Sequence, residues 1–138
     1  MNYFGLIAVT RAFAPVIERN GGGTVANVLS VASFVGIPAG AGYSASKAAA
    51  WSATQSLRAD LAPKGVRVVG VFPGPIDTDM AAGLEIDKTS PSIVASEVIA
   101  GIANGAEDIF PDPASKHIYT GWTVDHKAIE REFASFGA

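Results

Sequence analysis

Tyr43 and Lys47 are the residues of this sequence whose types and spacing most clearly allow chemistry. They stand four positions apart in an alanine-rich segment, and on a helix that spacing places both side chains on one face. A cation held beside a phenol favours the phenolate and lowers the tyrosine pKa from its ordinary value of about 10. A tyrosine in that setting can give or take a proton near neutral pH.

Ser30 is the third candidate, because it follows a short apolar run from Thr24 to Leu29 that predicts a buried strand. A serine hydroxyl at the carboxyl end of a strand can face the same crevice as Tyr43 and hydrogen-bond a substrate oxygen. Each residue alone has an ordinary explanation, as a helix residue or as a capping serine. It is their combination that indicates a catalytic site.

The elements around these residues alternate between helix and strand. We expect helices over residues 2 to about 19, 43–62 and 93–104, a terminal helix or tail over 125–136, and strands over 24–29, 66–72 and, weakly, 115–119. Ser90 or Ser92 is expected to cap the third helix, and residues 77–90 to form a polar excursion. The alternation is typical of parallel crossover units, so residues 1–138 are predicted to form a single α/β domain.

Composition excludes several classes of function. Hydrophobic residues make up 49% of the chain, and the formal net charge of -3 gives no basic surface for nucleic acid. No segment is uniformly apolar enough to cross a membrane. Cysteine is absent, which fits a cytoplasmic protein, and His117 and His126 lack partners at metal-ligand spacing, so no metal site is expected.

Ser30, twelve intervening residues, then Tyr43-Ser-Ala-Ser-Lys47 resemble the active site of the short-chain dehydrogenase/reductase family in order and spacing. Met1 to Gly5 resembles the asparagine-bearing helix of that family, and Pro73 to Thr78 resembles its segment after the next strand. The resemblance covers nearly the whole chain, as the C-terminal, catalytic part of such an enzyme. It implies a truncated Rossmann-like three-layer fold with about three mostly parallel strands.

The resemblance also implies roles for individual residues. Tyr43 would be the general acid in carbonyl reduction or the base in alcohol oxidation, and Lys47 would lower its pKa and bind the nicotinamide ribose. Ser30 would polarise the substrate oxygen, and Asn2 would hold a water in a proton relay. The implied substrate is a small carbonyl or alcohol compound, and the implied cofactor is NAD or NADP. The cofactor would contact Tyr43, Lys47, Pro73, Gly74, Ile76 and Thr78.

The sequence does not include three features by which the family binds the rest of its cofactor. They are a glycine-rich loop after the first strand, a ribose-selecting residue after the second, and an Asn-Asn-Ala-Gly segment. Residues 36–42 fit a Gly-x-x-x-Gly-x-Gly pattern, but the first glycine lies seven residues beyond Leu29 rather than in a tight turn. We interpret them as a substrate-side loop, and expect weak or absent dinucleotide binding by this chain alone.

Two alternatives to an oxidoreductase stay open at this point. Ser44 and Lys47 form a Ser-x-x-Lys motif beside Tyr43, which allows weak, cofactor-independent ester hydrolysis. The chain could instead be a non-catalytic remnant that associates with itself. The resemblance also implies self-association. In the family's strand order the strand 24–29 has a neighbour that this sequence lacks, so its edge would be unpaired, and a homodimer or homotetramer is the expected state.

Overall fold

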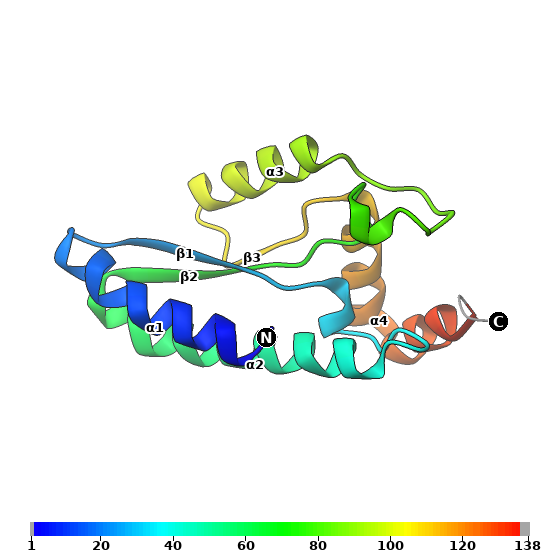
Figure 1. The fold of residues 1–138 in the computed structure, drawn as a ribbon, viewed down its shortest axis with the longest axis horizontal. Helices are drawn as coiled ribbons and strands as arrows, with labels where there is room; N and C mark the ends of the chain where they lie inside the picture. The colour runs from blue at the N-terminus through cyan, green and yellow to red at the C-terminus, as the bar shows by residue number, and fades with distance from the viewer. Residues whose placement is uncertain (1, 136–138) are drawn as a thin grey trace.

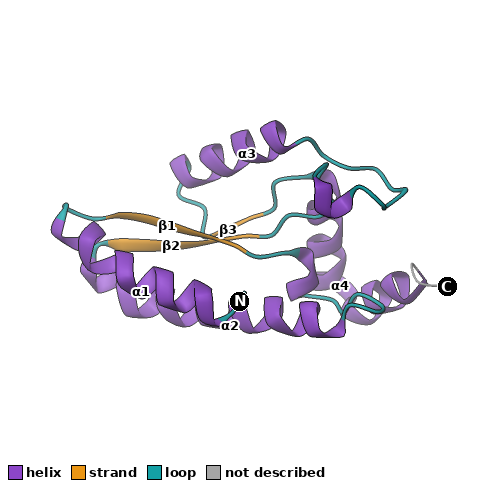
Figure 2. Ribbon diagram, in the orientation of Figure 1, coloured by secondary structure: helices purple, strands orange, loops and turns teal. Residues whose placement is uncertain are grey.

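A computed structural model describes residues 2–135 of the chain, so Met1 and Phe136 of the predicted segments lie outside the described residues. Along these described residues, four α-helices, three strands and three short 3-10 turns follow one another (Figures 1 and 2). Their bounds, in order, are α1 Phe4–Arg19, β1 Gly23–Val28, η1 Val31–Ser33, α2 Ala41–Leu61, η2 Ala62–Lys64, β2 Val66–Val71, η3 Asp79–Ala81, α3 Pro91–Ala103, β3 Asp108–Ile109 and α4 Pro113–Ala134.

The three strands form one parallel sheet in the order β1-β2-β3. β1 and β2 pair along their full length, from Gly23 opposite Val66 to Val28 opposite Val71. Figure 1 shows α1 and α2 side by side on one face of the sheet and α3 on the other. This arrangement confirms the predicted α/β, Rossmann-like three-layer fold with its short parallel sheet.

β2 is the central strand and holds the core together. Val66, Val68, Val69 and Val71 are buried, as expected for a parallel strand covered on both faces. The strand leads into Phe72, whose ring lies 4.7 Å from that of Phe34 and 5.3 Å from that of Phe110, measured between centroids. These rings fill the space at the carboxyl end of the sheet.

A buried polar network fixes α1 and α2 on β1. The Asn27 side chain donates from Nδ2 to Thr54 Oγ1 at 3.1 Å, and Thr54 Oγ1 donates to the Ala50 carbonyl at 2.8 Å. Thr10 Oγ1 donates to Asn27 Oδ1 at 3.5 Å. Because buried polar groups without partners are costly, this arrangement favours one position of each helix over the strand.

The predicted strand over 115–119 is wrong, because these residues lie in α4. Asp112 and Ser115 form a capping box at the start of that helix, where each side chain accepts from the other residue's backbone N–H. Pro113 occupies the first helical turn, which proline favours. The third strand is instead the two-residue β3, too short to show a period in the sequence.

Other boundaries agree with the pattern. Ser90 caps α3, its Oγ accepting from the Ile93 N–H at 3.4 Å. α4 contains one non-helical residue, Asp125, with φ -148° and ψ 90°. Its Oδ1 accepts from the N–H groups of Lys127 and Ala128, both at 3.0 Å, so a second helical segment starts where the terminal helix was predicted.

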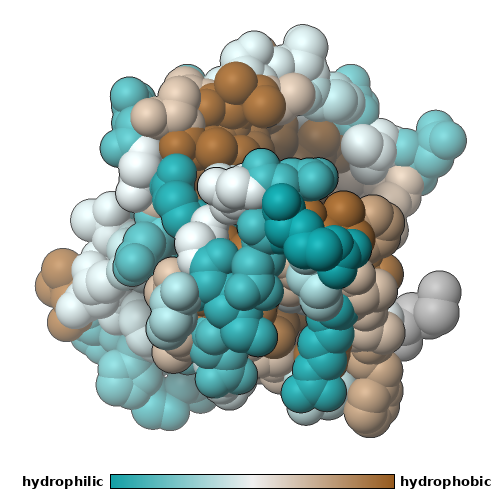
Figure 3. Space-filling view, turned by 90° about the vertical axis from the view of Figure 1, so that its left-hand side faces the viewer, coloured by the Kyte–Doolittle hydropathy of each residue, from teal (hydrophilic) through white to brown (hydrophobic). Residues whose placement is uncertain are grey.

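The α3 face of the sheet is incompletely covered. α3 buries none of its own residues, and Ile93 and Ile99 are exposed on it. Seen from the left-hand side of Figure 1, apolar surface gathers in the upper part of the molecule, at the level of α3 (Figure 3). In the described part of the chain, no helix combines the length and apolar character that a membrane span requires.

We expect Phe72→Ala to lower the free energy of unfolding by about 3–5 kcal/mol, because it empties a fully buried aromatic site. Val124→Ala, at a position that is 83% exposed, should change it by less than about 0.5 kcal/mol. Chemical denaturation of both variants measures the difference. Equal midpoints for the two variants would show that Phe72 is not central to the core.

Candidate active site

Tyr43 and Lys47 lie in the first turns of α2, which begins at Ala41 after Gly40. Lys47 Nζ is 5.8 Å from the centroid of the Tyr43 ring, so the two side chains share a face as their spacing predicts. Tyr43 is 39% exposed, and its hydroxyl makes no hydrogen bond within residues 2–135. The phenol is therefore open to a ligand.

Lys47 Nζ donates to the Val28 carbonyl oxygen at 3.1 Å. Leu29 N donates to Val71 O on β2, so the groups of the preceding residue, Val28, point away from β2 toward the free edge of β1. The side chain of Lys47 is half-buried, and burial lowers its pKa from the ordinary 10.5. Of the three N–H donors of an ammonium group, Val28 takes one.

Ser30 lies buried two residues after Val28, the carboxyl end of β1. Its Oγ accepts from the Ala32 N–H at 3.1 Å and so caps η1, which leaves the hydroxyl hydrogen free to donate. Val31 N donates to Pro73 O at 3.1 Å, which joins this segment to the residues after β2. Within the described residues no hydrogen bond joins the side chains of Ser30 and Tyr43.

Asn2 connects the start of α1 to the start of α2. Its Nδ2 donates to Ser46 Oγ at 3.1 Å, and Ser46 Oγ donates to the Tyr43 carbonyl at 2.7 Å. The structure thus brings Asn2 to the helical turn that carries Tyr43 and Lys47. These three predicted residues form one cluster at one end of α2.

The segment after β2 is held at two places. Pro73 O accepts from Val31 N, and Gly74 N donates to Asp112 Oδ2 at 2.8 Å. Farther along, Ile76 bridges to Thr89, and Thr78 Oγ1 donates to Ile76 O at 3.4 Å. Pro73 and Gly74 therefore lie beside the residues that follow Ser30. Ile76 and Thr78 lie instead at the start of the loop over residues 77–90, whose two ends meet where Ile76 pairs with Thr89.

Sequence reasoning missed Asp112, which contacts the backbone of a predicted site residue. The signal was present as Asp-Pro-x-Ser, the pattern of a capped helix start. Ser44 was considered as a nucleophile, but its side chain is buried and its Oγ accepts from the Ile37 N–H at 3.0 Å. That engagement disfavours the ester-hydrolase alternative. Residues 2–135 contain no group of three or more potential metal ligands.

Comparison with known proteins supplies independent information. The sequence model of the family described as short chain dehydrogenase matches residues 1–89. A 3-oxoacyl-(acyl-carrier-protein) reductase of Synechocystis is 36% identical over 130 residues, which cover 91% of this chain and 51% of the relative. A 3alpha-hydroxysteroid dehydrogenase of Mediterraneibacter gnavus is 36% identical over 105 residues, covering 76% of this chain and 40% of the relative.

Among solved structures, a short chain dehydrogenase from Burkholderia cenocepacia in complex with NADP superimposes with a TM-score of 0.90 and 39% identity. The match covers 96% of this chain and 55% of that protein. The chain thus spans about half the length of the relatives it matches, or less.

The lowered pKa of Lys47 makes a direct prediction. In ¹³C-labelled protein with unmodified lysines, the Cε resonance of Lys47, assigned by its loss in Lys47→Arg, should titrate below 10.5. Between the folded pKa and 10.5 the folded state holds fewer protons than the unfolded state, so the free energy of unfolding attributable to Lys47 should rise with pH there. Titration at or above 10.5 would contradict the burial argument.

Proposed function

The chain belongs to the short-chain dehydrogenase family, and we propose that it forms the catalytic part of an oxidoreductase that uses NAD or NADP. The substrate class is a small carbonyl or alcohol compound. The observation that carries the proposal is the Tyr43–Lys47 pair at the start of α2, beside the carboxyl end of the strand that leads to Ser30. The NADP complex of the Burkholderia relative supports the choice of cofactor.

The donors around the pair fit a nicotinamide riboside. Lys47 gives one N–H to Val28 and retains two, which suit the two hydroxyls of a ribose. The exposed Tyr43 hydroxyl can hydrogen-bond one of the same two ribose hydroxyls. When bound, the nicotinamide supplies or accepts a hydride at the substrate carbon. Pro73, Gly74, Ile76 and Thr78 are the proposed contacts of its carboxamide.

Proton transfer is the task assigned to Tyr43. In the reducing direction its Oη–H bond breaks and the proton passes to the substrate oxygen, as the carbon of the same carbonyl gains a hydride; oxidation reverses both transfers. The Lys47 ammonium stabilises the resulting phenolate. Ser30, whose hydroxyl hydrogen is not used within the fold, donates to the substrate oxygen and orients it.

We propose that Asn2 holds the water at the outer end of the proton relay to Tyr43. Asn2 is tied through Ser46 to the turn that carries Tyr43, so a water held by Asn2 would lie at the start of α2. Nothing in this chain matches the family's binding segments for the pyrophosphate and adenosine. We therefore propose that the chain by itself binds dinucleotide weakly.

Tyr43→Phe in the full-length protein should reduce kcat by at least about a thousandfold, because only the ionisable oxygen is lost. Tyr119→Phe is the matched control, since Tyr119 stacks on Phe110 in the aromatic core and should leave turnover unchanged. Nicotinamide absorbance follows the reaction, and circular dichroism checks the fold. Wild-type turnover in Tyr43→Phe would exclude the assigned chemistry.

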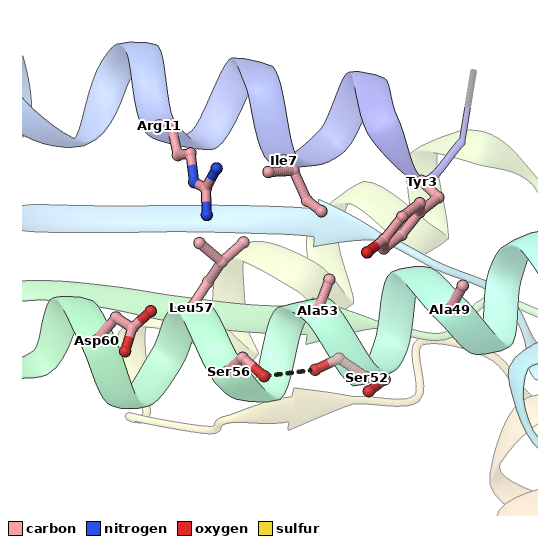
Figure 4. A pocket seen from close by; sticks show the side chains of 9 residues that line it. All are labelled: Tyr3, Ile7, Arg11, Ala49, Ser52, Ala53, Ser56, Leu57 and Asp60. Atoms are coloured by element: carbon pink, nitrogen blue, oxygen red, sulfur yellow. Dashed lines mark hydrogen bonds between the residues drawn. The ribbon is translucent and has the colours of Figure 1, made fainter.

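The outer face of α1 and α2 is the proposed interface with a second copy. A groove of about 330 Å³ runs between the two helices (Figure 4). Arg11 and Asp60 line it from opposite helices without an ion pair between them. In a two-fold symmetric dimer the same surface of both protomers forms the interface. Arg11 of one protomer can therefore face Asp60 of its partner.

Light scattering of the chain should therefore give at least twice its mass of 14.1 kDa. Ala53→Arg fills the groove with a charge and should shift the sample to the monomer mass, whereas Ala103→Arg, on exposed α3, should not. A single, folded 14.1 kDa species for the unsubstituted chain would refute the interface.

A further inference from the structure

Asp112 has a buried side chain whose two carboxylate oxygens both accept from backbone N–H groups. It is 1% exposed, and no ion pair with a cationic side chain is formed by it within residues 2–135. Oδ1 accepts from Ser115 N at 2.9 Å, at the start of α4, and Oδ2 accepts from Gly74 N at 2.8 Å. The positive end of the helix dipole and these two N–H groups offset the charge.

The peptide between Pro73 and Gly74 is held from both sides. Its N–H points to Asp112, and its C=O accepts from Val31, the residue after Ser30. In a planar trans peptide these two groups point in opposite directions, so fixing both fixes the orientation of the whole plane. A Cβ on Gly74 would lie only 2.7 Å from Asp112 Oδ1, so the glycine allows the carboxylate to approach.

Helix capping alone does not require both oxygens. Asn or Ser caps a helix about as well as Asp does, through a single acceptor oxygen. Here Oδ1 performs that task and Oδ2 is committed to another segment of the chain, across the carboxyl edge of the sheet. The need for a second acceptor oxygen at position 112 thus comes from the Pro73–Gly74 peptide and not from the capping of α4.

We propose that Asp112 is a positioning residue that sets the Pro73–Gly74 peptide relative to Ser30, and through it the backbone that contacts the nicotinamide carboxamide. This inference rests on the proposed function. Asp112 itself does not touch the reacting atoms. Its loss would move the cofactor's contact surface while leaving Tyr43 and Lys47 in place on α2.

Asp112→Asn separates the two tasks. The asparagine Oδ1 can still cap α4, but Nδ2 then faces the Gly74 N–H, so a donor opposes a donor. In this chain, hydrogen exchange should show the Gly74 amide losing protection by about tenfold or more, with α4 amides retained. In the full-length protein, KM for the nicotinamide cofactor should rise about tenfold with a much smaller change in kcat.

Ser115→Ala is the matched control, because it weakens the capping box and leaves Oδ2 on Gly74. It should lower the melting temperature without altering the cofactor KM. If Asp112→Asn does not fold, Asp112→Ser takes its place, because a serine can still cap α4 but is too short to reach the Gly74 N–H as well, and KM should rise in the same way. Unchanged Gly74 exchange or unchanged KM would overturn the positioning role. Absence of nicotinamide-dependent turnover in the unsubstituted protein would instead overturn the proposed function, while exchange still tests the contact.

Discussion

Parallel pairing of β1 with β2 requires the chain to return from one end of the sheet to the other between the two strands, and α2 makes that return. The helix must therefore begin at the carboxyl edge of the strands. Its first turns carry Tyr43 and Lys47, so the pairing itself delivers them to the end of β1. The Asn27–Thr54 hydrogen bond then fixes how far α2 lies along the strand. The contacts of Lys47 with Val28 and of Asn2 with Ser46 both depend on this placement.

Most of the fold could be predicted from residue patterns, because the helices and the two long strands carry strong local signals. The alanine-rich run before Pro63 and the valines of β2 are of this kind. β3 could not be predicted, since two residues show no period and gain their strand geometry only by pairing with Gly70 and Val71. The segment 115–119 is helical because the capping box at Asp112 starts α4 there, which outweighs the strand preference of Ile118 and Tyr119.

The candidate site divides in the same way. Tyr43 and Lys47 are four apart on one helix, so local geometry was enough to bring them together. The link between Asn2 and Ser46, and that between Gly74 and Asp112, join segments far apart in sequence. Tertiary packing decides such contacts, and one sequence contains no pattern that encodes them. The same holds for Lys47 and Val28, whose bond depends on β1 having a free edge.

The crossover also governs the order in which the molecule can assemble. α2 can form early from local contacts. β1 and β2, however, can pair only after the ends of the connecting chain, which includes all of α2, have been brought together. Until then, the valines of β2 and the edge of β1 are open to neighbouring chains in a crowded solution. A sheet built this way matures slowly, and its yield on refolding should fall as protein concentration rises.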